Sequence, residues 1–292
     1  MLVNPGEWIC MKFTEIEAIV LDMDGVLWRG EEPLPGLIEL FQWLDESETP
    51  YVLATNNSSK TQADYVNKLV RMGVTSVPET RIITSGMATA MYLQKVYPAG
   101  THVYVFGMDG LRKTMEAAGF ETGDADGVPA VVVAGIHFGV TYEDLKRATL
   151  YLRAGARLVG TNPDVTYPSP EGQAPGAGSF VAALEAAGGT KATIIGKPDR
   201  PMFETALEIV GKPAGSTLMV GDRLATDILG AQQVGMKTAL VLSGVTNRET
   251  LSSSANDIWP DVAFDGLPEL LTAWAGFEWY NLKLKAKRQA NR

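Results

Sequence analysis

The stretch that decides the fold is AIVLDMDGVLW, residues 18–28. Its first four residues are apolar and partly β-branched, which predicts a buried β-strand. Asp22 and Asp24 follow two residues apart, so an extended backbone points both carboxylates to the same side, and Gly25 lets the chain turn tightly. Two acidic groups directly after a buried strand indicate a site at the end of a sheet.

The rest of the chain alternates short apolar runs with segments of helical periodicity, which predicts an α/β protein with a parallel sheet covered on both faces. Strands are expected at residues 18–21, 51–54, 102–106, 130–134, 157–159, 192–195, 217–220 and 238–242. Helices are expected at residues 37–44, 60–72, 110–118, 142–152, 201–210 and 227–233. Gly73, Gly119 and Gly155 are placed to end helices, and Thr141 is placed to cap one.

The chain length of 292 residues suits two domains. Residues 85–187 contain their own expected strands and helices, so we expect them to form an α/β lobe inserted into the rest of the chain. The expected division is residues 12–84 and 188–275 as the core, 85–187 as the inserted lobe, 1–11 as an N-terminal extension and 276–292 as a basic C-terminal tail.

The charge balance argues against a nucleic-acid partner. The chain has 25 Lys and Arg against 34 Asp and Glu, a formal net charge of −9, so it lacks the broad basic surface that a polyanion requires. The single cysteine, Cys10, excludes an intrachain disulfide and a multi-cysteine zinc site. The sequence shows neither a signal peptide nor a run of about 18 apolar residues, so we expect a cytoplasmic protein with no membrane partner.

Polar residues end four of the expected strands. They are Asp22, Thr55, Lys197 and Asp222, at the ends of AIVLD, YVLAT, ATIIGK and TLMVGD. In an open parallel sheet the ligand crevice lies outside the carboxyl ends of the strands, so these side chains converge there if their strands are neighbours. Each residue alone could be a cap or a turn residue, whereas four together favour a ligand site.

Four aspartates at or close to these strand ends predict a divalent cation. Asp22 and Asp24 would share the site with Asp222 and Asp227 of GDRLATD, and their mutual repulsion is costly unless a cation neutralises it. Carboxylate and carbonyl oxygens suit Mg²⁺, and no cluster of His or Cys competes for a softer metal. We therefore expect Mg²⁺ as the cofactor.

A metal ion with Lys197, Thr55 and Asn56 would cradle a phosphoryl group, because phosphoryl transfer depends on positioning and on neutralising the phosphoryl oxygens. An aspartate can attack phosphorus without prior deprotonation, and Asp22 is the better nucleophile because it stands directly at the strand end. Asp24 is placed to protonate the leaving group and then to activate water. These residue types together predict a phosphoryl-transfer enzyme.

The sequence resembles the haloacid dehalogenase superfamily of aspartate-nucleophile phosphatases, and within it the NagD-like subfamily IIA, over about residues 15–270. The segments that carry the resemblance are DMDGVLW (22–28), TNNSSKT (55–61), GTNPD (160–164), PGAGS (175–179), GKP (196–198) and GDRLATDILGA (221–231). PGAGS is also expected to begin a helix packed closely on the sheet. The resemblance implies a Rossmann-like, doubly wound parallel sheet core with an inserted, mobile α/β cap domain.

The resemblance implies catalytic and metal-binding roles for the four aspartates. Asp22 would be the nucleophile, forming an aspartyl-phosphate, and also a metal ligand. Asp24 would be the general acid/base and would bind Mg²⁺ through its carbonyl. Asp222 and Asp227 would hold the metal.

The resemblance also implies substrate-binding residues. Thr55 and Asn56 would bind the phosphate, and Lys197 would bridge nucleophile and phosphate. Asn162, within GTNPD, is a further expected substrate-binding residue. The expected activity is the hydrolysis of small phosphate monoesters, the expected partner is a small phosphorylated metabolite, and a homodimer through the cap is a further expectation.

Three alternative functions fit parts of this pattern. A receiver-like signalling module also holds a phospho-aspartate, but Thr55 and Lys197 are 142 positions apart (197 − 55), and an inserted lobe suits a lid that excludes water. Dehalogenation is disfavoured by Asp24, because displacement of a halide needs no acid for an alkoxide leaving group. A phosphomutase on the same fold stays open.

Overall fold

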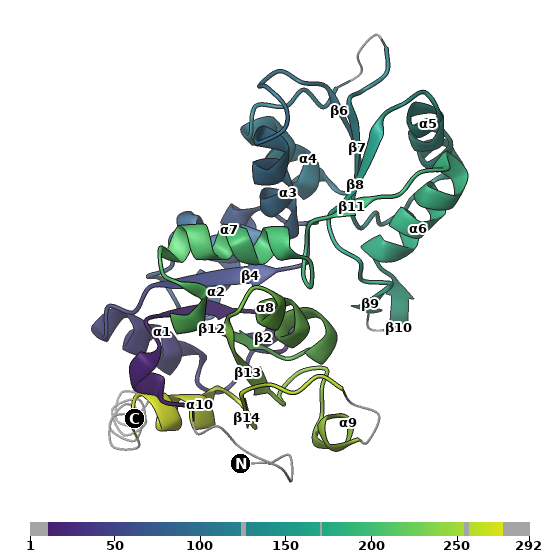
Figure 1. Ribbon diagram of the computed structural model, residues 1–292. Coiled ribbons are helices and arrows are strands. Elements are labelled where there is room, and N and C mark those ends of the chain that lie inside the picture. The colour runs from purple at the N-terminus through teal and green to yellow at the C-terminus, as the bar shows by residue number, and fades with distance from the viewer. Residues whose placement is uncertain (1–10, 124–126, 170, 254–256, 277–292) are drawn as a thin grey trace. The chain divides into compact units, whose positions relative to one another are not determined.

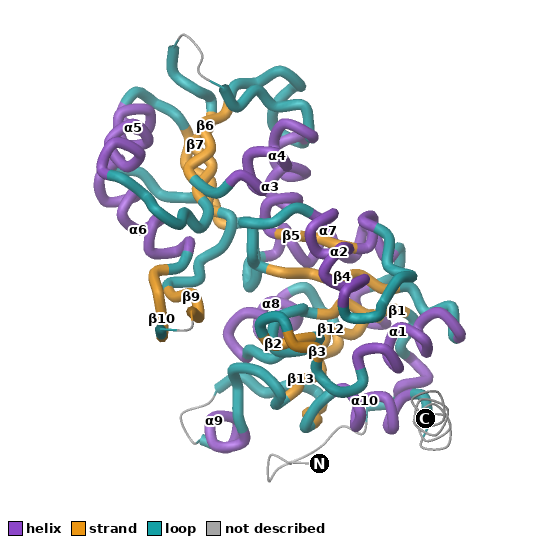
Figure 2. The backbone as a smooth tube through the Cα atoms, turned by 180° about the vertical axis from the view of Figure 1, so that it is seen from behind, coloured by secondary structure: helices purple, strands orange, loops and turns teal. Residues whose placement is uncertain are grey.

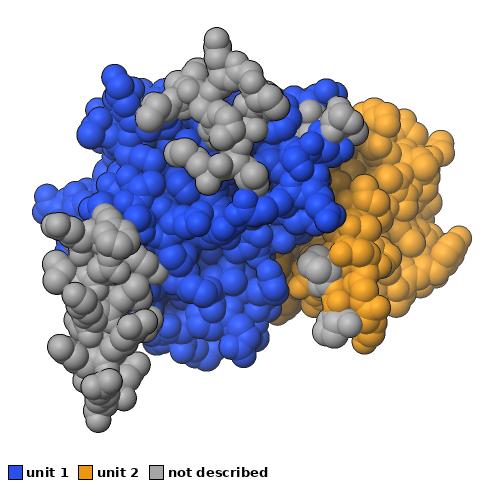
Figure 3. Space-filling view, turned by 90° about the horizontal axis from the view of Figure 1, so that it is seen from below, with its two compact units in different colours: residues 1–54, 66–82, 206–292 blue, residues 55–65, 83–205 orange. Residues whose placement is uncertain are grey.

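The computed structural model describes residues 11–123, 127–169, 171–253 and 257–276 (Figure 1). The chain divides into two compact units, residues 1–54, 66–82 and 206–292 in the first and residues 55–65 and 83–205 in the second (Figure 3). Cys10 and most of the expected N-terminal extension and basic tail lie outside the described residues.

A six-stranded sheet, most of which belongs to the first unit, has the order β14-β13-β12-β1-β4-β5. Its strands are β1 (Ala18–Leu21), β4 (Tyr51–Thr55), β5 (Ile82–Thr84), β12 (Thr217–Gly221), β13 (Lys237–Val241) and β14 (Val262–Phe264). β1 pairs in parallel with β12 on one side and with β4 on the other. Every residue of β1 and β12 is buried, as expected for central strands of a sheet covered on both faces.

Helices precede or follow the strands of this sheet along the chain. They are α1 (Leu37–Glu46), α2 (Gln62–Arg71), α7 (Arg200–Val210), α8 (Leu229–Gln233), α9 (Arg248–Ser252) and α10 (Leu267–Trp274). Trp43 of α1 packs edge-on against Trp274 of α10, with ring centroids 4.6 Å apart. A short antiparallel hairpin, β2 (Trp28–Arg29) and β3 (Glu32–Pro33), follows β1.

The second unit has its own parallel sheet of four strands, in the order β11-β8-β7-β6. The strands are β6 (Val103–Phe106), β7 (Val131–Ala134), β8 (Arg157–Gly160) and β11 (Thr193–Ile194). Helices α5 (Tyr142–Arg153) and α6 (Ala177–Gly188) cover one face, and α3 (Ser85–Gln94) and α4 (Asp109–Ala117) lie on the other (Figures 1 and 2). An antiparallel hairpin, β9 (Thr166–Ser169) and β10 (Gly172–Pro175), precedes α6.

The structure confirms the predicted α/β class with a Rossmann-like parallel core. Gly73, Gly119 and Gly155 end their helices with positive φ angles of 90°, 89° and 107°. Thr141 caps α5 in a capping box with Asp144. The segment PGAGS leads into α6, as predicted. None of the helices in the described ranges is long and apolar enough to cross a membrane.

Two kinds of element differ from the prediction. The helix expected at residues 227–233 begins earlier, as a π-helix over Leu224–Ile228 that continues into α8. Helix α3 was not predicted, because its buried residues include Gly86, Ala88 and Ala90 and its polar and apolar residues do not separate into two faces. Strands β5 and β14 were not predicted either, because each has three residues, too few to show a periodicity.

Candidate active site

Three buried aspartates gather where β1 and β12 end side by side. Asp22 follows β1, Asp222 follows β12, and Asp227 lies in the π-helix that comes next. One carboxylate oxygen of each lies within 4.8 Å of the others, and the three residues are 8%, 1% and 1% exposed. We call Asp22, Asp222 and Asp227 the acidic cluster; its members were all predicted from the sequence.

Main-chain N–H groups orient two of these carboxylates. Val245 N donates to Asp222 Oδ2 at 2.7 Å. Asp227 Oδ2 accepts from Asp222 N at 3.2 Å and from Arg223 N at 3.0 Å. The π-helical turn places Asp227 over the end of β12, which fits the tendency of π-turns to occur at functional sites.

Two glycines leave just enough room for the Asp222 carboxylate. A Cβ atom on Gly25 would lie 2.3 Å from Asp222 Oδ2, and one on Gly244 would lie 1.9 Å from the same oxygen. Gly25 also has a φ angle of 89°, which favours glycine. Sequence reasoning pointed to Gly25 but not to Gly244, which stands in a loop with no motif around it.

The acidic cluster fits a hard divalent cation. Like charges this close in a buried setting repel one another, and hard oxygen donors are the ligands that Mg²⁺ prefers. Among the described residues, the set of converging acidic side chains contains Asp22, Asp222 and Asp227 and not the side chain of Asp24. Asp24 is exposed, and its Oδ1 accepts a hydrogen bond from Trp28 Nε1 at 2.8 Å.

A second group, which we call the amide cluster, consists of Asn56, Asn162, Asp164 and Lys197 in the second unit. Asn56 Oδ1 accepts from Lys197 N at 2.8 Å, and Asn56 Nδ2 donates to Lys197 O at 2.8 Å and to Asp164 Oδ2 at 3.1 Å. The Asn56 side chain therefore binds both main-chain groups of Lys197. Lys197 itself is 2% exposed.

Asn162 binds the main chain of Asn56 in this cluster. Its Nδ2 donates to Asn56 O at 2.6 Å, and its Oδ1 accepts from Asp164 N at 3.1 Å. The loop that carries it lies against the start of α6, where a Cβ on Gly178 would lie 2.2 Å from Pro163 O. The GTNPD and PGAGS segments are thus joined by close main-chain packing, which requires the two glycines of PGAGS, Gly176 and Gly178.

The four strands that end in polar residues do not all belong to one sheet. Asp22, Thr55 and Asp222 do follow strands of one sheet, because β1, β4 and β12 are neighbours. The strand before Lys197, β11, instead pairs with β8 in the sheet of the second unit. Lys197 therefore does not follow a strand of the same sheet as the aspartates.

Sequence reasoning missed three residues that bind the predicted site residues. Asp164 and Ser85 both bind Asn56, Ser85 Oγ donating to Asn56 O at 2.6 Å, and Trp28 binds Asp24. Asp164 and Trp28 belong to motif segments, so their positions alone could have marked them. Ser85 had no such signal.

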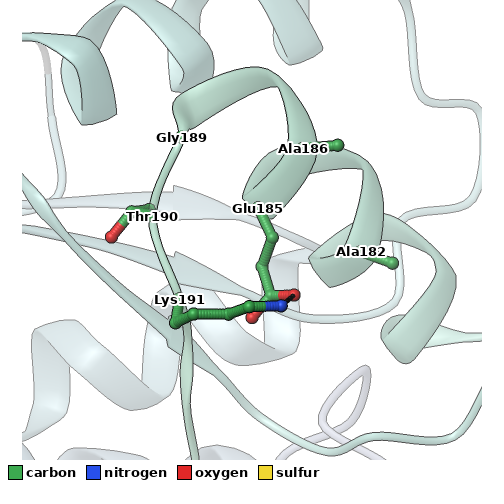
Figure 4. Close-up of a pocket in the computed structure, with 6 residues that line it drawn as sticks. All are labelled: Ala182, Glu185, Ala186, Gly189, Thr190 and Lys191. Atoms are coloured by element: carbon green, nitrogen blue, oxygen red, sulfur yellow. Dashed lines mark hydrogen bonds and ion pairs between the residues drawn. The ribbon is translucent and has the colours of Figure 1, made fainter.

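A hollow at the carboxyl end of α6 has a structural explanation (Figure 4). Lys191 Nζ lies 3.0 Å from Glu185 Oε2, and Ala192 N donates to Glu185 Oε1 at 2.8 Å. That main-chain hydrogen bond and then Lys191 hold the pKa of the Glu185 carboxyl below its usual range. Glu185 and Lys191 therefore stabilise the turn after α6. The lining residues are Ala182, Glu185, Ala186, Gly189, Thr190 and Lys191.

Comparison with known families places the chain. Residues 19–121 match the family described as haloacid dehalogenase-like hydrolase, and residues 194–270 match a family described as HAD-hydrolase-like. The 5'-nucleotidase YutF of Bacillus subtilis is 36% identical over 86% of this chain and 95% of its own length. An acid sugar phosphatase of Staphylococcus epidermidis is 34% identical over 86% of this chain and 95% of its own.

Solved structures of similar proteins point to the same family. The 4-nitrophenylphosphatase of Thermotoga maritima has a TM-score of 0.83 at 38% identity and covers 90% of this chain and 98% of its own. NagD of E. coli has a TM-score of 0.78 at 31% identity and covers 86% and 97%. The chain therefore belongs to the haloacid dehalogenase-like hydrolases. Within that family it falls in the NagD-like group, and it is a phosphoric monoester hydrolase.

The crowding at Gly244 predicts the effect of a single methyl group. Gly244→Ala should displace the Asp222 carboxylate and lower kcat/KM for 4-nitrophenyl phosphate by about 100-fold, because a misplacement of about 1 Å costs that much. Gly215→Ala is the matched control, since no atom lies within 4 Å of its added Cβ. Equal activity of the two variants would contradict the steric role of Gly244.

Proposed function

We propose that this phosphatase hydrolyses small phosphate monoesters with Mg²⁺ through a phosphoryl group held on Asp22. The observation that supports the proposal most is the acidic cluster, in which three buried carboxylates come within 4.8 Å at the ends of two adjacent strands. Such a concentration of negative charge needs a cation, and a phosphate ester is the substrate class of the relatives.

In the proposed first step, a carboxylate oxygen of Asp22 attacks phosphorus and the bond to the leaving oxygen breaks. Asp24 gives its proton to that oxygen, so the alcohol departs neutral. In the second step Asp24 takes a proton from water, the water oxygen attacks phosphorus, and the bond to Asp22 breaks. Inorganic phosphate is released and both aspartates return to their starting state.

We propose that the side chains of Asp22, Asp222 and Asp227 and the carbonyl of Asp24 hold the metal. A bound Mg²⁺ would neutralise the carboxylates and the phosphoryl oxygens. The main-chain donors to Asp222 and Asp227 keep these carboxylates in place, so their geometry depends little on the substrate.

The substrate-binding roles divide between direct and supporting residues. We propose that Thr55 and Lys197 contact the phosphoryl group, with residues 85–187 acting as a cap. The side chain of Asn56 binds both main-chain groups of Lys197, so we propose that its contribution is to fix that lysine. Asn162 would act one step further back, through Asn56.

Singly phosphorylated small molecules are the proposed substrates. Residues 160–187, which include the hairpin β9–β10, carry no Lys or Arg, whereas a second phosphate usually recruits such residues. Relatives are named for a 5'-nucleotidase, a sugar phosphatase and a 4-nitrophenylphosphatase activity. The three named activities have in common that the substrate is a phosphate monoester, whereas the leaving group differs among them.

Metal removal tests the cofactor. Excess chelator should abolish phosphate release and added Mg²⁺ should restore it. Asp222→Asn should raise the Mg²⁺ concentration for half-maximal rate by at least about tenfold, because one charged ligand is lost. Asp45→Asn, on the exposed side of α1, is the control. Full turnover of the metal-free enzyme would refute the proposed cofactor.

Substitution of the two strand-end aspartates separates their roles. Asp22→Asn should abolish turnover and leave no covalently bound phosphate after a pulse of labelled substrate. Asp24→Asn should slow turnover by about 10²- to 10⁴-fold, the usual contribution of a general acid or base. An Asp22→Asn enzyme with a near wild-type rate, after contaminating phosphatase is excluded, would overturn the nucleophile assignment.

The charge of the second unit's hairpin region predicts substrate preference. Monophosphorylated metabolites and aryl phosphates should have higher kcat/KM values than nucleoside diphosphates or sugar bisphosphates. Phosphate release from one enzyme preparation across the panel measures these ratios. A clear preference for a bisphosphate would show that basic residues elsewhere decide recognition.

A further inference from the structure

The carboxylate of Asp24 is tied to a buried tryptophan. Trp28 Nε1 donates to Asp24 Oδ1 at 2.8 Å, and Trp28 is 0% exposed whereas Asp24 is exposed. Asp24 makes no further hydrogen bond or ion pair with any residue that the structure describes. An indole N–H is a donor only, so Oδ1 stays an acceptor and the other oxygen is left to serve a ligand.

The main chain between Asp24 and Trp28 forms a tight, hydrogen-bonded turn. Gly25 N donates to Trp28 O at 2.8 Å, and Leu27 N donates to Met23 O at 2.8 Å. Asp24 and Trp28 also form a single bridge of the kind found between strands. The tight turn after the nucleophile position therefore brings the indole back to the aspartate four residues before it.

A buried lysine holds the other side of the indole. Lys68 Nζ lies 4.3 Å from the centre of the Trp28 ring, a distance typical of a cation–π interaction. The same Nζ donates to Gly30 O at 2.6 Å and lies 3.6 Å from Glu31 Oε1, while the lysine side chain is 5% exposed. The ring is thus fixed between a charge on its face and a carboxylate at its edge.

We propose that Trp28, supported by Lys68, is a positioning residue that holds Asp24 in the orientation from which it protonates the leaving oxygen. This inference rests on the proposed role of Asp24 as general acid. An exposed aspartate has two free side-chain torsions, and a hydrogen bond to a rigid buried ring selects one arrangement. The positive charge on the ring face polarises the indole and strengthens its N–H as a donor.

A purely structural tryptophan would behave differently from a positioning one. Loss of a buried ring edge lowers stability and slows every substrate alike. Loss of acid positioning lowers kcat/KM only for those substrates whose leaving group needs a proton, because the later hydrolysis step, in which Asp24 acts as a base, does not enter kcat/KM. Two esters with the same nitroaryl group separate the cases: 4-nitrophenolate leaves without a proton, whereas the alkoxide of 4-nitrobenzyl phosphate requires one.

The test is Trp28→Phe, which keeps an aromatic ring and removes the N–H. We expect kcat/KM for 4-nitrobenzyl phosphate to fall by about tenfold or more, and that for 4-nitrophenyl phosphate by less than about threefold. Trp43→Phe is the matched control, because it removes the same atoms from a tryptophan that packs on Trp274. An equal loss for both esters would overturn the proposal.

A double variant tests whether Trp28 acts through Asp24, and an NMR spectrum tests their hydrogen bond. Trp28→Phe in an Asp24→Ala background should cause little further loss, because a residue that acts through Asp24 has nothing left to position. Additive losses would overturn the proposal. In ¹⁵N-labelled protein the Trp28 indole N–H resonance should move in Asp24→Ala, and an unmoved resonance would refute the hydrogen bond without any reference to activity.

Two further outcomes separate this inference from the proposed function. If Asp24→Ala lowers kcat/KM for both esters equally, Asp24 is not the acid, and both its proposed role and this inference fall. If Asp24→Ala is selective and Trp28→Phe is not, the inference alone falls. Should Trp28→Phe fail to fold, Lys68→Met keeps the aliphatic stem and removes the charge, and the same selectivity at smaller size is expected.

Discussion

Mutual repulsion among Asp22, Asp222 and Asp227 is the constraint on which the rest of the structure depends. Buried carboxylates whose oxygens come within 4.8 Å would separate unless the surrounding chain held them. The parallel pairing of β1 with β12 fixes two of them, and the π-helix fixes the third. Main-chain donors to Asp222 and Asp227, and two glycines against Asp222, then leave these two carboxylates a narrow range of positions.

The sequence predicted the acidic cluster because strand-end position and chemistry coincide there. Runs such as AIVL and TLMV are typical of buried strands, and an acid directly after each one is then expected at the sheet edge. The same logic gave the α/β class. It did not give α3, whose small buried residues carry no periodic signal, or the π-turn, which depends on a hydrogen bond to a residue five positions back.

Contacts between distant segments could not be predicted. Nothing in the local pattern around Gly244 shows that it lies against Asp222, and nothing around Lys68 shows that it covers the ring of Trp28. Similarly, Asn56 and Lys197 look like two ligand-facing residues in the sequence, whereas the structure shows the first binding the main chain of the second. Residue type and spacing locate chemistry along the chain, and tertiary packing decides which group supports which.

The pairing of β1 with β12 also constrains the order of assembly. Ala18 lies opposite Thr217, so the centre of the larger sheet joins segments that are 199 positions apart in the sequence (217 − 18). On a ribosome, the Asp22 segment emerges long before its partners exist, whereas β6, β7 and β8 can pair as soon as they are made, since their partners are close in sequence. The acidic cluster therefore cannot form until Asp227 has been made, 205 residues after Asp22 (227 − 22), and the second unit can fold first.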